Sequence, residues 1–199
     1  MCFVPTQNKV YLFGGNFQGY PLNDMWVFDL NTMNWQKINL PQTAPQARWG
    51  HKMLYVEKHK KIYIFGGQKD YTPSGLLYDL WWYDISNNTF FEIKNPQSDW
   101  PVGLSHFSMS YNKATDSLIV FGGYKSENPN YSNEVWFFNI VSTSFVKSPI
   151  LYLNSPEGIE KSCLVNIADK FLVYGGFNGT SCLNKTYYYH YSSSGSATS

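Results

Sequence analysis

The chain has 199 residues, with 15 Lys and Arg against 14 Asp and Glu, so its net charge is +1. This balance gives no overall field that would attract nucleic acid or an anionic membrane, and we expect neither as a partner. No stretch approaches the roughly 18 apolar residues of a membrane helix, and the first residues lack the pattern of a signal peptide. The cysteines, Cys2, Cys163 and Cys182, are odd in number and lack metal-like spacing. The sequence therefore predicts reduced thiols and a cytoplasmic location.

The first segment, residues 1–38, alternates short hydrophobic runs with turn residues. Met1 aligns with Met53 of the next segment, which predicts that the first segment begins inside its first strand. A hydrophobic run ends at Gly14-Gly15, and an aromatic run containing Trp26 follows it. Trp35 comes nine residues after Trp26. Runs of this kind, bounded by turn residues, predict antiparallel β-strands.

The second segment, residues 48–94, shows the full pattern. It opens with Arg48-Trp49-Gly50-His51 and has four aromatic or β-branched runs, which predict four antiparallel strands, A to D. Gly66-Gly67 follows strand B, Trp81 lies in strand C and Phe90 lies in strand D. Because Asp84 precedes a turn, as Asp29 does, we expect both carboxylates to accept hydrogen bonds from nearby backbone amides.

The third and fourth segments, residues 103–148 and 160–191, repeat this pattern. Their B strands end at Gly122-Gly123 and Gly175-Gly176. The third has Trp136 in strand C and Phe145 in strand D, whereas the fourth has Tyr187 at the Trp position. A serine-rich stretch, residues 192–199, follows in place of a fourth strand D. We expect this tail to be disordered and the fourth segment to lack its outer strand.

The four glycine pairs are in phase, with first glycines at 14, 66, 122 and 175 and intervals of 52, 56 and 53 residues. A fixed period near 50 indicates one supersecondary unit copied along the chain, and such a unit must stack on its neighbours to bury its apolar face. The glycine pairs, the aromatic C and D strands and the Arg-x-Gly-His segment resemble the kelch repeat, and the resemblance covers almost the whole chain.

The resemblance implies an all-β, kelch-type β-propeller over residues 1–191, with about four four-stranded blades of which the first and last are incomplete. The blades lie approximately at residues 1–38, 48–94, 103–148 and 160–191. Since kelch rings usually have six or seven blades, the chain is expected to form a partial ring or a small propeller. Self-association, or further blades from another chain, would cover its unpaired faces.

The repeated residues have structural roles that follow from their chemistry. Glycine pairs can adopt positive φ where a Cβ costs about 1–2 kcal/mol, and the aromatic side chains can fill the space between adjacent sheets. The predicted structural residues are Gly14, Gly15, Gly66, Gly67, Gly122, Gly123, Gly175, Gly176, Trp26, Trp35, Trp81, Phe90, Trp136, Phe145 and Tyr187.

Recognition is expected on the face that carries the long B–C and D–A loops, because loops supply variable, exposed side chains. Tyr, Trp and Arg are enriched in binding hot spots. For each candidate the alternative is a role in holding its own loop, and for Arg48 it is a place in the repeat motif. The candidate partner-binding residues are Tyr20, Arg48, Trp49, Tyr71, Trp100, Lys125, Tyr131 and Tyr152.

The leading hypothesis is a non-enzymatic scaffold or adaptor that binds a protein partner, as kelch resemblance generally implies. One alternative is a propeller enzyme or an iron-dependent specifier-type protein, because some relatives have these activities. A cytoskeletal or trafficking scaffold is a second alternative, with the basic turn at residues 58–61 as a contact. His51 and His106 are interpreted as one repeat phase, and His59 and His190 as two others. Three phases do not form one metal site, so we predict no catalytic residue, metal or cofactor.

Overall fold

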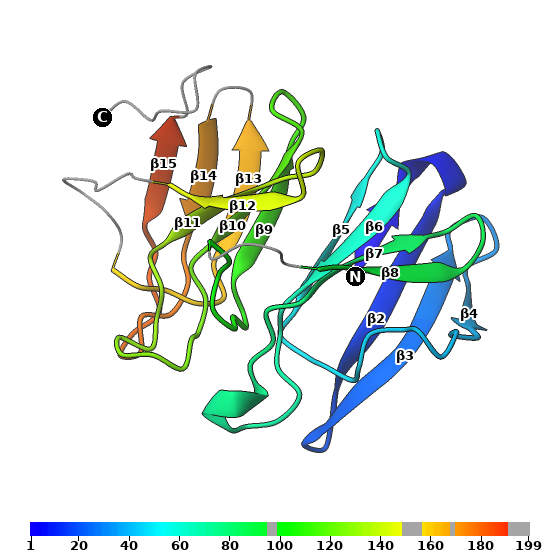
Figure 1. The fold of residues 1–199 in the computed structure, drawn as a ribbon, viewed down its shortest axis with the longest axis horizontal. Helices are drawn as coiled ribbons and strands as arrows, with labels where there is room; N and C mark the ends of the chain where they lie inside the picture. The colour runs from blue at the N-terminus through cyan, green and yellow to red at the C-terminus, as the bar shows by residue number, and fades with distance from the viewer. Residues whose placement is uncertain (95–98, 149–156, 168–169, 191–199) are drawn as a thin grey trace. The chain divides into compact units, whose positions relative to one another are not determined.

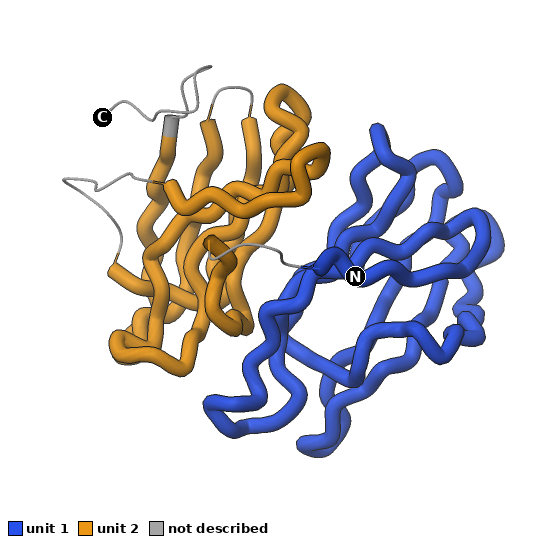
Figure 2. Tube along the Cα trace, viewed as in Figure 1, with its two compact units in different colours: residues 1–94 blue, residues 95–199 orange. Residues whose placement is uncertain are grey.

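The structure is a computed structural model that describes residues 1–94, 99–148, 157–167 and 170–190. The chain forms two compact units, residues 1–94 and residues 95–199, shown in Figure 2. Each unit contains two antiparallel sheets, and the described residues include only two short 3₁₀ turns (Figure 1). The predicted all-β fold of four propeller blades is confirmed. The predicted serine-rich tail at 192–199 lies outside the described residues.

Unit 1 holds sheets 1 and 2, each with its four strands in chain order. Sheet 1 consists of β1 (Cys2–Val4), β2 (Lys9–Phe17), β3 (Tyr20–Asp29) and β4 (Asn34–Ile38), with the 3₁₀ turn η1 (Pro5–Gln7) after β1. Sheet 2 consists of β5 (Lys52–Val56), β6 (Lys61–Phe65), β7 (Leu80–Asp84) and β8 (Thr89–Ile93), with η2 (Pro73–Gly75) between β6 and β7. The three-residue β1 is shorter than the five-residue β5 at the same position of sheet 2.

Unit 2 holds sheets 3 and 4. Sheet 3 consists of β9 (Ser108–Asn112), β10 (Ser117–Phe121), β11 (Val135–Asn139) and β12 (Ser144–Lys147). Sheet 4 has three described strands, β13 (Cys163–Ile167), β14 (Lys170–Tyr174) and β15 (Thr186–His190). In every sheet the third strand pairs with the second strand, and the paired region includes the predicted aromatic residue of strand C.

The turns between the third and fourth strands are closed by side chains that the sequence identified. Asp29 Oδ1 accepts the Asn31 N–H at 2.8 Å, and Asp84 Oδ1 accepts the Ser86 N–H at 2.9 Å. Sheet 3 uses Asn139 in the same way. These side chains satisfy backbone donors that the tight turn leaves without a partner, so the expected turn role is confirmed.

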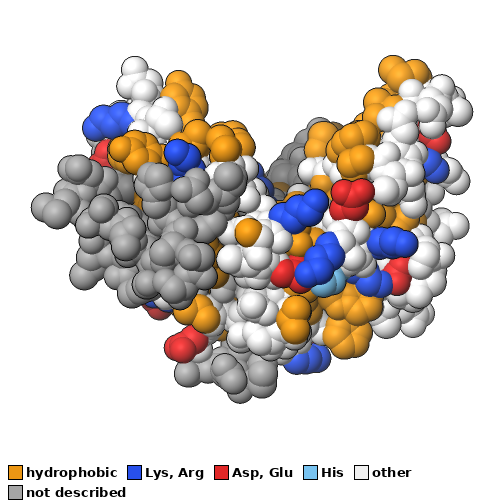
Figure 3. Space-filling view, turned by 90° about the horizontal axis from the view of Figure 1, so that it is seen from above, with side chains coloured by type: hydrophobic (Ala, Val, Ile, Leu, Met, Phe, Trp, Pro, Cys, Tyr) orange, Lys and Arg blue, Asp and Glu red, His pale blue; other side chains and the backbone are white. Residues whose placement is uncertain are grey.

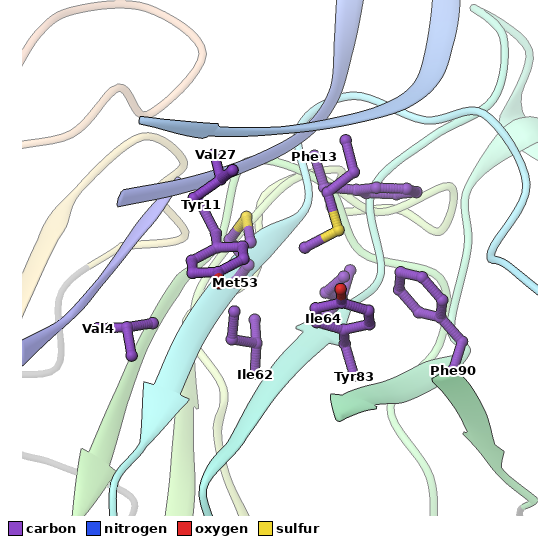
Figure 4. Close-up of a cluster of buried hydrophobic side chains, with 10 residues drawn as sticks. Val4, Tyr11, Phe13, Val27, Met53, Ile62, Ile64, Tyr83 and Phe90 are labelled. Atoms are coloured by element: carbon purple, nitrogen blue, oxygen red, sulfur yellow. The ribbon is translucent and has the colours of Figure 1, made fainter. Parts of the chain in front are cut away.

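The core of unit 1 lies between its two sheets. Alternation along each strand turns Tyr11 and Phe13 of sheet 1 toward Ile62 and Ile64 of sheet 2, as Figure 4 shows. Phe90 of β8 completes this core, with its ring centroid 6.1 Å from that of Phe13. All five side chains are at most 6% exposed. The interface is apolar and aromatic-rich, as in other packed sheets.

Unit 2 has an equivalent core between sheets 3 and 4. Ile119 and Phe121 of β10 pack with Phe171 and Val173 of β14, and all four are at most 1% exposed. Tyr189 stacks on Phe171 with a centroid distance of 4.6 Å and an interplanar angle of 10°. The same strand positions thus build the core of both units, as copies of one repeat should.

One predicted core residue is exposed. Trp35 was expected to fill the space between sheets, but its side chain is 50% exposed and contacts Phe28 at a centroid distance of 5.0 Å. Phe90 and Phe145, at the same position of sheets 2 and 3, are 6% and 4% exposed. The difference arises because, in the part of unit 1 that the structure describes, no sheet packs against the face of sheet 1 that bears Trp35.

The glycine pairs adopt the backbone conformation that the sequence predicted, since all eight glycines have positive φ. Close packing adds a second requirement. A Cβ on Gly122 would lie 2.5 Å from the Ile159 carbonyl oxygen, and one on Gly14 would lie 2.6 Å from the Arg48 carbonyl oxygen. Gly175 has more room, since its nearest neighbour would be the Leu183 oxygen at 3.4 Å.

Candidate protein-binding site

The segment that leads into each blade is hydrogen-bonded to the loop that follows the glycine pair. Trp49 and Gln68 exchange two backbone hydrogen bonds, of 3.0 and 2.8 Å, and Gln68 also forms a β-bridge with Leu76. The same three-way pairing joins Ser105, Tyr124 and Tyr131 in sheet 3, and Glu160, Phe177 and Cys182 in sheet 4. The D–A and B–C segments therefore lie side by side at one end of sheets 2, 3 and 4.

Sheet 1 departs from this arrangement. Its second and third strands continue beyond Gly14-Gly15, which form a bulge, and they close only at Gln18-Gly19. The side chain of Asn16 accepts the Gly19 N–H at 2.9 Å and closes the hairpin. The glycine pair of sheet 1 is therefore followed by a long, tight hairpin in place of a loop.

Arg48 ties this hairpin to sheet 2. Its backbone N–H donates to Leu22 O at 3.0 Å, and its carbonyl accepts the Gly15 N–H at 2.9 Å. Its guanidinium donates two 2.7 Å hydrogen bonds to Asp79, in a bidentate geometry, and a third to the carbonyl of Gly66. Burial alone would raise the pKa of Asp79, but these hydrogen bonds and the Arg48 charge hold that pKa below its usual value.

The structure therefore corrects the surface prediction for Arg48, whose side chain is fully buried. Its hydrogen bonds to Asp79 and Gly66 within sheet 2 agree with the alternative role, a structural place in the repeat motif. Trp49 is also buried, at 8% exposure, and its ring lies 5.0 Å from that of Tyr71. The buried Trp49 ring packs against the inner side of the loop that carries Tyr71, and Tyr71 itself remains at the surface.

Exposed aromatic side chains gather above this support. Tyr20 and Tyr71 are 73% and 72% exposed, and Phe17, which pairs with Tyr20 across the hairpin, is 63% exposed. The Asn16 amide donates to the Tyr71 hydroxyl at 3.4 Å and so joins the hairpin to the loop at residues 67–79. We call the three side chains Phe17, Tyr20 and Tyr71 the aromatic tip. Figure 1 shows the hairpin and this loop at the same end of unit 1.

The opposite end of the sheets carries the short A–B turns and has a different character. Figure 3 looks onto this end and shows Lys or Arg side chains beside Asp or Glu side chains, with hydrophobic ones between them. In the basic turn of unit 1, Lys61 forms an ion pair with Asp84 and lies 4.4 Å from the centroid of the Trp82 ring. This lysine is engaged within its own sheet.

In unit 2, aromatic side chains of the loops at the corresponding end of the sheets pack against one another. Tyr131 is partly buried, and its ring lies 5.9 Å from Tyr124 and 6.0 Å from Phe177. A Cβ on Gly179 would lie 2.5 Å from the Tyr131 ring, so this ring is wedged against the backbone. Tyr131 holds three segments together and presents less surface than the tyrosines of the aromatic tip.

The remaining candidates differ in position. Trp100 is partly buried and packs edge-on against Phe145 at 4.7 Å, so it covers sheet 3. Lys125 is partly buried, and Tyr152 lies outside the described residues. Among the candidates, the structure therefore brings together Trp49 and Tyr71 by contact, with Tyr20 on the adjoining hairpin.

Sequence reasoning missed one recurring contact. An acidic residue two positions before each strand-C tryptophan accepts its indole N–H. The pairs are Asp24 with Trp26 at 2.7 Å, Asp79 with Trp81 at 2.6 Å and Glu134 with Trp136 at 3.0 Å. The signal was available as an acid at a fixed offset in three segments. Each carboxylate gives the buried or half-buried indole N–H a hydrogen-bond partner and orients the ring, so the role of the acidic residue is structural.

The histidines also require a correction. The β-bridges align Trp49 with Ser105, so His106 corresponds to Gly50 and not to His51, and its φ is +56°. His106 Nδ1 lies 3.7 Å from a Glu160 oxygen. The His51 ring packs edge-on against Phe13, and burial lowers its pKa to about 3. In the described ranges, no three His, Cys, Asp or Glu side chains are grouped so that they could hold a metal ion.

The cysteines differ in exposure. Cys2 is partly buried, and burial raises its pKa to about 12, whereas Cys163 and Cys182 are exposed. Within the described part of the chain, no helix is long and apolar enough to cross a membrane.

Four antiparallel blades, each with an aromatic third strand and with a glycine pair that follows the second strand in sheets 2 to 4 and forms a bulge within it in sheet 1, define a β-propeller repeat protein. The model of the KLHDC2/KLHL20/DRC7 Kelch-repeats domain matches residues 1–102 and 60–197. The chain belongs to the kelch-repeat family, which confirms the resemblance seen in the sequence.

Individual relatives support the same conclusion. The chain is 27% identical over 187 residues to Kelch domain-containing protein 2 of Bos taurus, a match that covers 87% of this chain and 44% of the relative. It is 32% identical over 132 residues to Kelch repeat-containing protein 2 of Saccharomyces cerevisiae, covering 58% and 14%. It is 32% identical over 126 residues to Multiple epidermal growth factor-like domains protein 8 of Homo sapiens, covering 62% and 4%. The chain thus spans less than half the length of these relatives.

Proposed function

We propose that the chain is a protein-interaction module that binds its partner through the aromatic tip of unit 1. Kelch-repeat domains are commonly protein-interaction modules. The observation that carries the assignment to this surface is the exposure of Tyr20 and Tyr71, both above 70%, on segments that are hydrogen-bonded to one another. Large aromatic side chains with a polar group are the commonest binding hot spots.

The support beneath the tip favours recognition by a preformed surface. The buried Arg48, with its bidentate contact to Asp79, and the buried Trp49 hold the hairpin and the loop in place. A surface that is ordered before binding loses less conformational entropy on association. The tip is therefore suited to bind an apolar or aromatic surface of a partner while the tyrosine hydroxyls supply orientation.

The test is the double variant Tyr20→Ala, Tyr71→Ala, compared with the wild-type chain. Proteins that crosslink to the wild-type chain in cells would be identified by mass spectrometry, and each would be purified for a binding titration. We expect the double substitution to raise Kd by about 100-fold or more, since two hot spots contribute about 2 kcal/mol each. Phe91→Ala is the control, because Phe91 is an exposed aromatic residue, 56% exposed, in the middle of β8. Equal affinity of the double variant and the wild type, at equal melting temperature, would contradict the proposal.

A further inference from the structure

The loop at residues 67–79 carries a threonine followed by a proline, directly beside Tyr71 of the aromatic tip. The sequence contains three Ser-Pro or Thr-Pro pairs, at residues 72–73, 148–149 and 155–156, and the structure describes both residues of the first pair. Thr72 is exposed and extended, with φ −87° and ψ 155°, and Pro73 begins the 3₁₀ turn η2. Proline favours an extended conformation of the residue before it. The Thr72 hydroxyl therefore lies on an exposed, extended segment that a proline-directed protein kinase can bind.

Asp70 holds the turn that contains Thr72. One carboxylate oxygen, Asp70 Oδ1, accepts hydrogen bonds from the Thr72 hydroxyl and from the Thr72 N–H, the latter at 2.8 Å. These two hydrogen bonds hold the pKa of Asp70 below its usual value, so the carboxylate is ionised at neutral pH. The Lys69 N–H donates to Gly75 O at 2.9 Å, and the Gly75 N–H donates to Thr72 O at 3.0 Å. The Thr72 hydroxyl is thus a donor to an anion within a closed loop.

A phosphate on Thr72 is incompatible with this turn. It replaces the hydroxyl proton that is donated to Asp70 and adds a charge of about −1.5 to −2 at pH 7. The two anions repel each other, and the single charge of Lys69, which acts on Asp70, does not offset both. The carboxylate also lies against the backbone of Gly75, where a Cβ would be 2.0 Å from Asp70 Oδ1. It has no space to move away in that direction, so the turn must open.

Opening the turn would displace Tyr71, which lies between Asp70 and Thr72 in the sequence. The Tyr71 ring lies 5.0 Å from the Trp49 ring, and its hydroxyl accepts the Asn16 amide at 3.4 Å. Both contacts depend on the position of the loop backbone, which the turn at Asp70 fixes. A phosphate two atoms from this backbone therefore acts on the aromatic tip.

We propose that Thr72 is a phosphorylation site and that its phosphate weakens partner binding by displacing Tyr71 from the aromatic tip. The effect on binding rests on the proposed function of the tip, whereas the modification itself does not. The enzyme is a proline-directed protein kinase, and the phosphoryl donor is ATP. Thr72 Oγ forms a bond to the γ-phosphorus, the bond from that phosphorus to the oxygen it shares with the β-phosphorus breaks, and ADP leaves. The hydroxyl proton passes to a base of the kinase.

Mapping of phosphate by mass spectrometry tests the site. The purified chain is incubated with ATP and a cyclin-dependent kinase and, in a separate reaction, with a mitogen-activated protein kinase. We expect phosphate on Thr72, no phosphate at this position in the Thr72→Val chain, and loss of most of it in the Pro73→Ala chain. Thr32→Val is the matched control, because Thr32 is exposed but is followed by Met33, and it is expected to leave phosphorylation of Thr72 unchanged. A folded wild-type chain without phosphate on Thr72 in either reaction would overturn the proposal.

Hydrogen exchange tests the release of the loop without a partner. After phosphorylation the amides of Lys69, Thr72 and Gly75 are expected to exchange about tenfold faster or more, because the open turn leaves all three N–H groups without their acceptors. The Thr72→Val chain loses the hydroxyl hydrogen bond but gains no charge, so its amides are expected to exchange more slowly than those of the phosphorylated chain. Equal exchange in the phosphorylated and unmodified chains would overturn the release of the loop.

Binding titrations test the consequence, with each protein that crosslinks to the wild-type chain as the probe. Phosphorylation is expected to raise Kd by about 30-fold, as the loss of one hot-spot residue does, and phosphatase treatment is expected to restore the original Kd. An unchanged Kd after phosphorylation, for a partner whose Kd rises in the Tyr71→Ala chain, would overturn the regulatory role. If the double variant Tyr20→Ala, Tyr71→Ala binds like the wild type, the proposed function of the tip fails, while phosphate mapping and hydrogen exchange still decide whether Thr72 is a phosphorylation site.

Discussion

His51→Phe is expected to make the protein less sensitive to acid. His51 leads into sheet 2, where its ring lies 5.7 Å from that of Phe13 and its Nδ1 has no hydrogen-bond partner among the described residues. Burial, followed by the positive charges of Arg48, the N-terminal amine and Lys52, lowers the pKa of His51 to about 3. Phe107 occupies the equivalent position before sheet 3 and is fully buried, which indicates that an aromatic hydrocarbon ring fits this environment.

The magnitude follows from the difference in proton binding between the folded and unfolded states. Unfolded His51 has a pKa of about 6.5, so below this pH the unfolded chain binds a proton that the folded chain excludes. Because the folded pKa is depressed, the free energy of unfolding falls as the pH drops from about 6.5 toward about 3. At about 1.36 kcal/mol per pH unit, the loss between pH 6.5 and pH 5 is about 2 kcal/mol.

Urea unfolding at several pH values between 7 and 5 measures this effect. The free energy of unfolding of the wild-type chain is expected to fall by about 2 kcal/mol more than that of the His51→Phe chain over this interval. Taking the difference between the two chains removes the contribution of carboxylates that titrate in both. Equal losses in the two chains would refute the reasoning, as would an NMR signal of the His51 ring that titrates near pH 6.5 in the folded state.

Five further substitutions test the packing of the blades by denaturant unfolding. Gly122→Ala is expected to destabilise the protein by several kcal/mol because its Cβ would meet a carbonyl oxygen at 2.5 Å, whereas Gly175→Ala, with 3.4 Å of room, is expected to cost about 1–2 kcal/mol from its positive φ alone. Phe90→Ala is expected to cost about 3–5 kcal/mol and the half-exposed Trp35→Ala distinctly less, measured at low protein concentration; equal losses would contradict the exposure of Trp35. Arg48→Met is expected to cost about 3–5 kcal/mol, because it leaves a carboxylate that is mostly buried without its cation, and a loss below 1 kcal/mol would show that the ion pair does not stabilise the fold.

Much of the fold could be predicted because the repeat marks every blade independently. A glycine pair needs positive φ in any context, and an Asp at the end of a third strand accepts backbone hydrogen bonds within its own turn. Both requirements are local, so the sequence contains all the information they need. The strand order and the glycine conformations therefore match the prediction.

Properties that depend on a neighbouring element could not be predicted in this way. Trp35 and Phe90 occupy the same repeat position, yet only Phe90 is buried, since a second sheet packs against its face. The alignment of His106 with His51 failed because the segment between sheets 2 and 3 differs in length from the one between sheets 1 and 2, and only the β-bridges show the true correspondence with Gly50. Burial and register across loops are tertiary properties.

Only part of the candidate site could be predicted, because the burial of a loop residue also depends on its neighbours in the fold. Tyr20 and Tyr71 were predicted as loop residues of a type that is enriched in binding hot spots, and both are exposed. Arg48 is also of such a type, but its side chain is fully buried. The carboxylate of Asp79, 31 residues away in the sequence, distinguishes them because it provides a buried partner for the guanidinium. Phe17 was missed because the hairpin of sheet 1 extends beyond its glycine pair, which no other sheet does in the residues described.

The loops of the two units share the same backbone bridges but place different side chains at the surface. In both units, a lead-in segment is bridged to the residue after the glycine pair and then to the following loop. In unit 2 the tyrosine at that bridge, Tyr131, turns into its own loops and is wedged against Gly179. In unit 1, Trp49 fills the support position, so Tyr71 and the adjoining hairpin tip remain at the surface. The side chain that lies beneath the loops therefore decides which aromatic rings reach the surface of each unit, although the backbone bridges are the same in both.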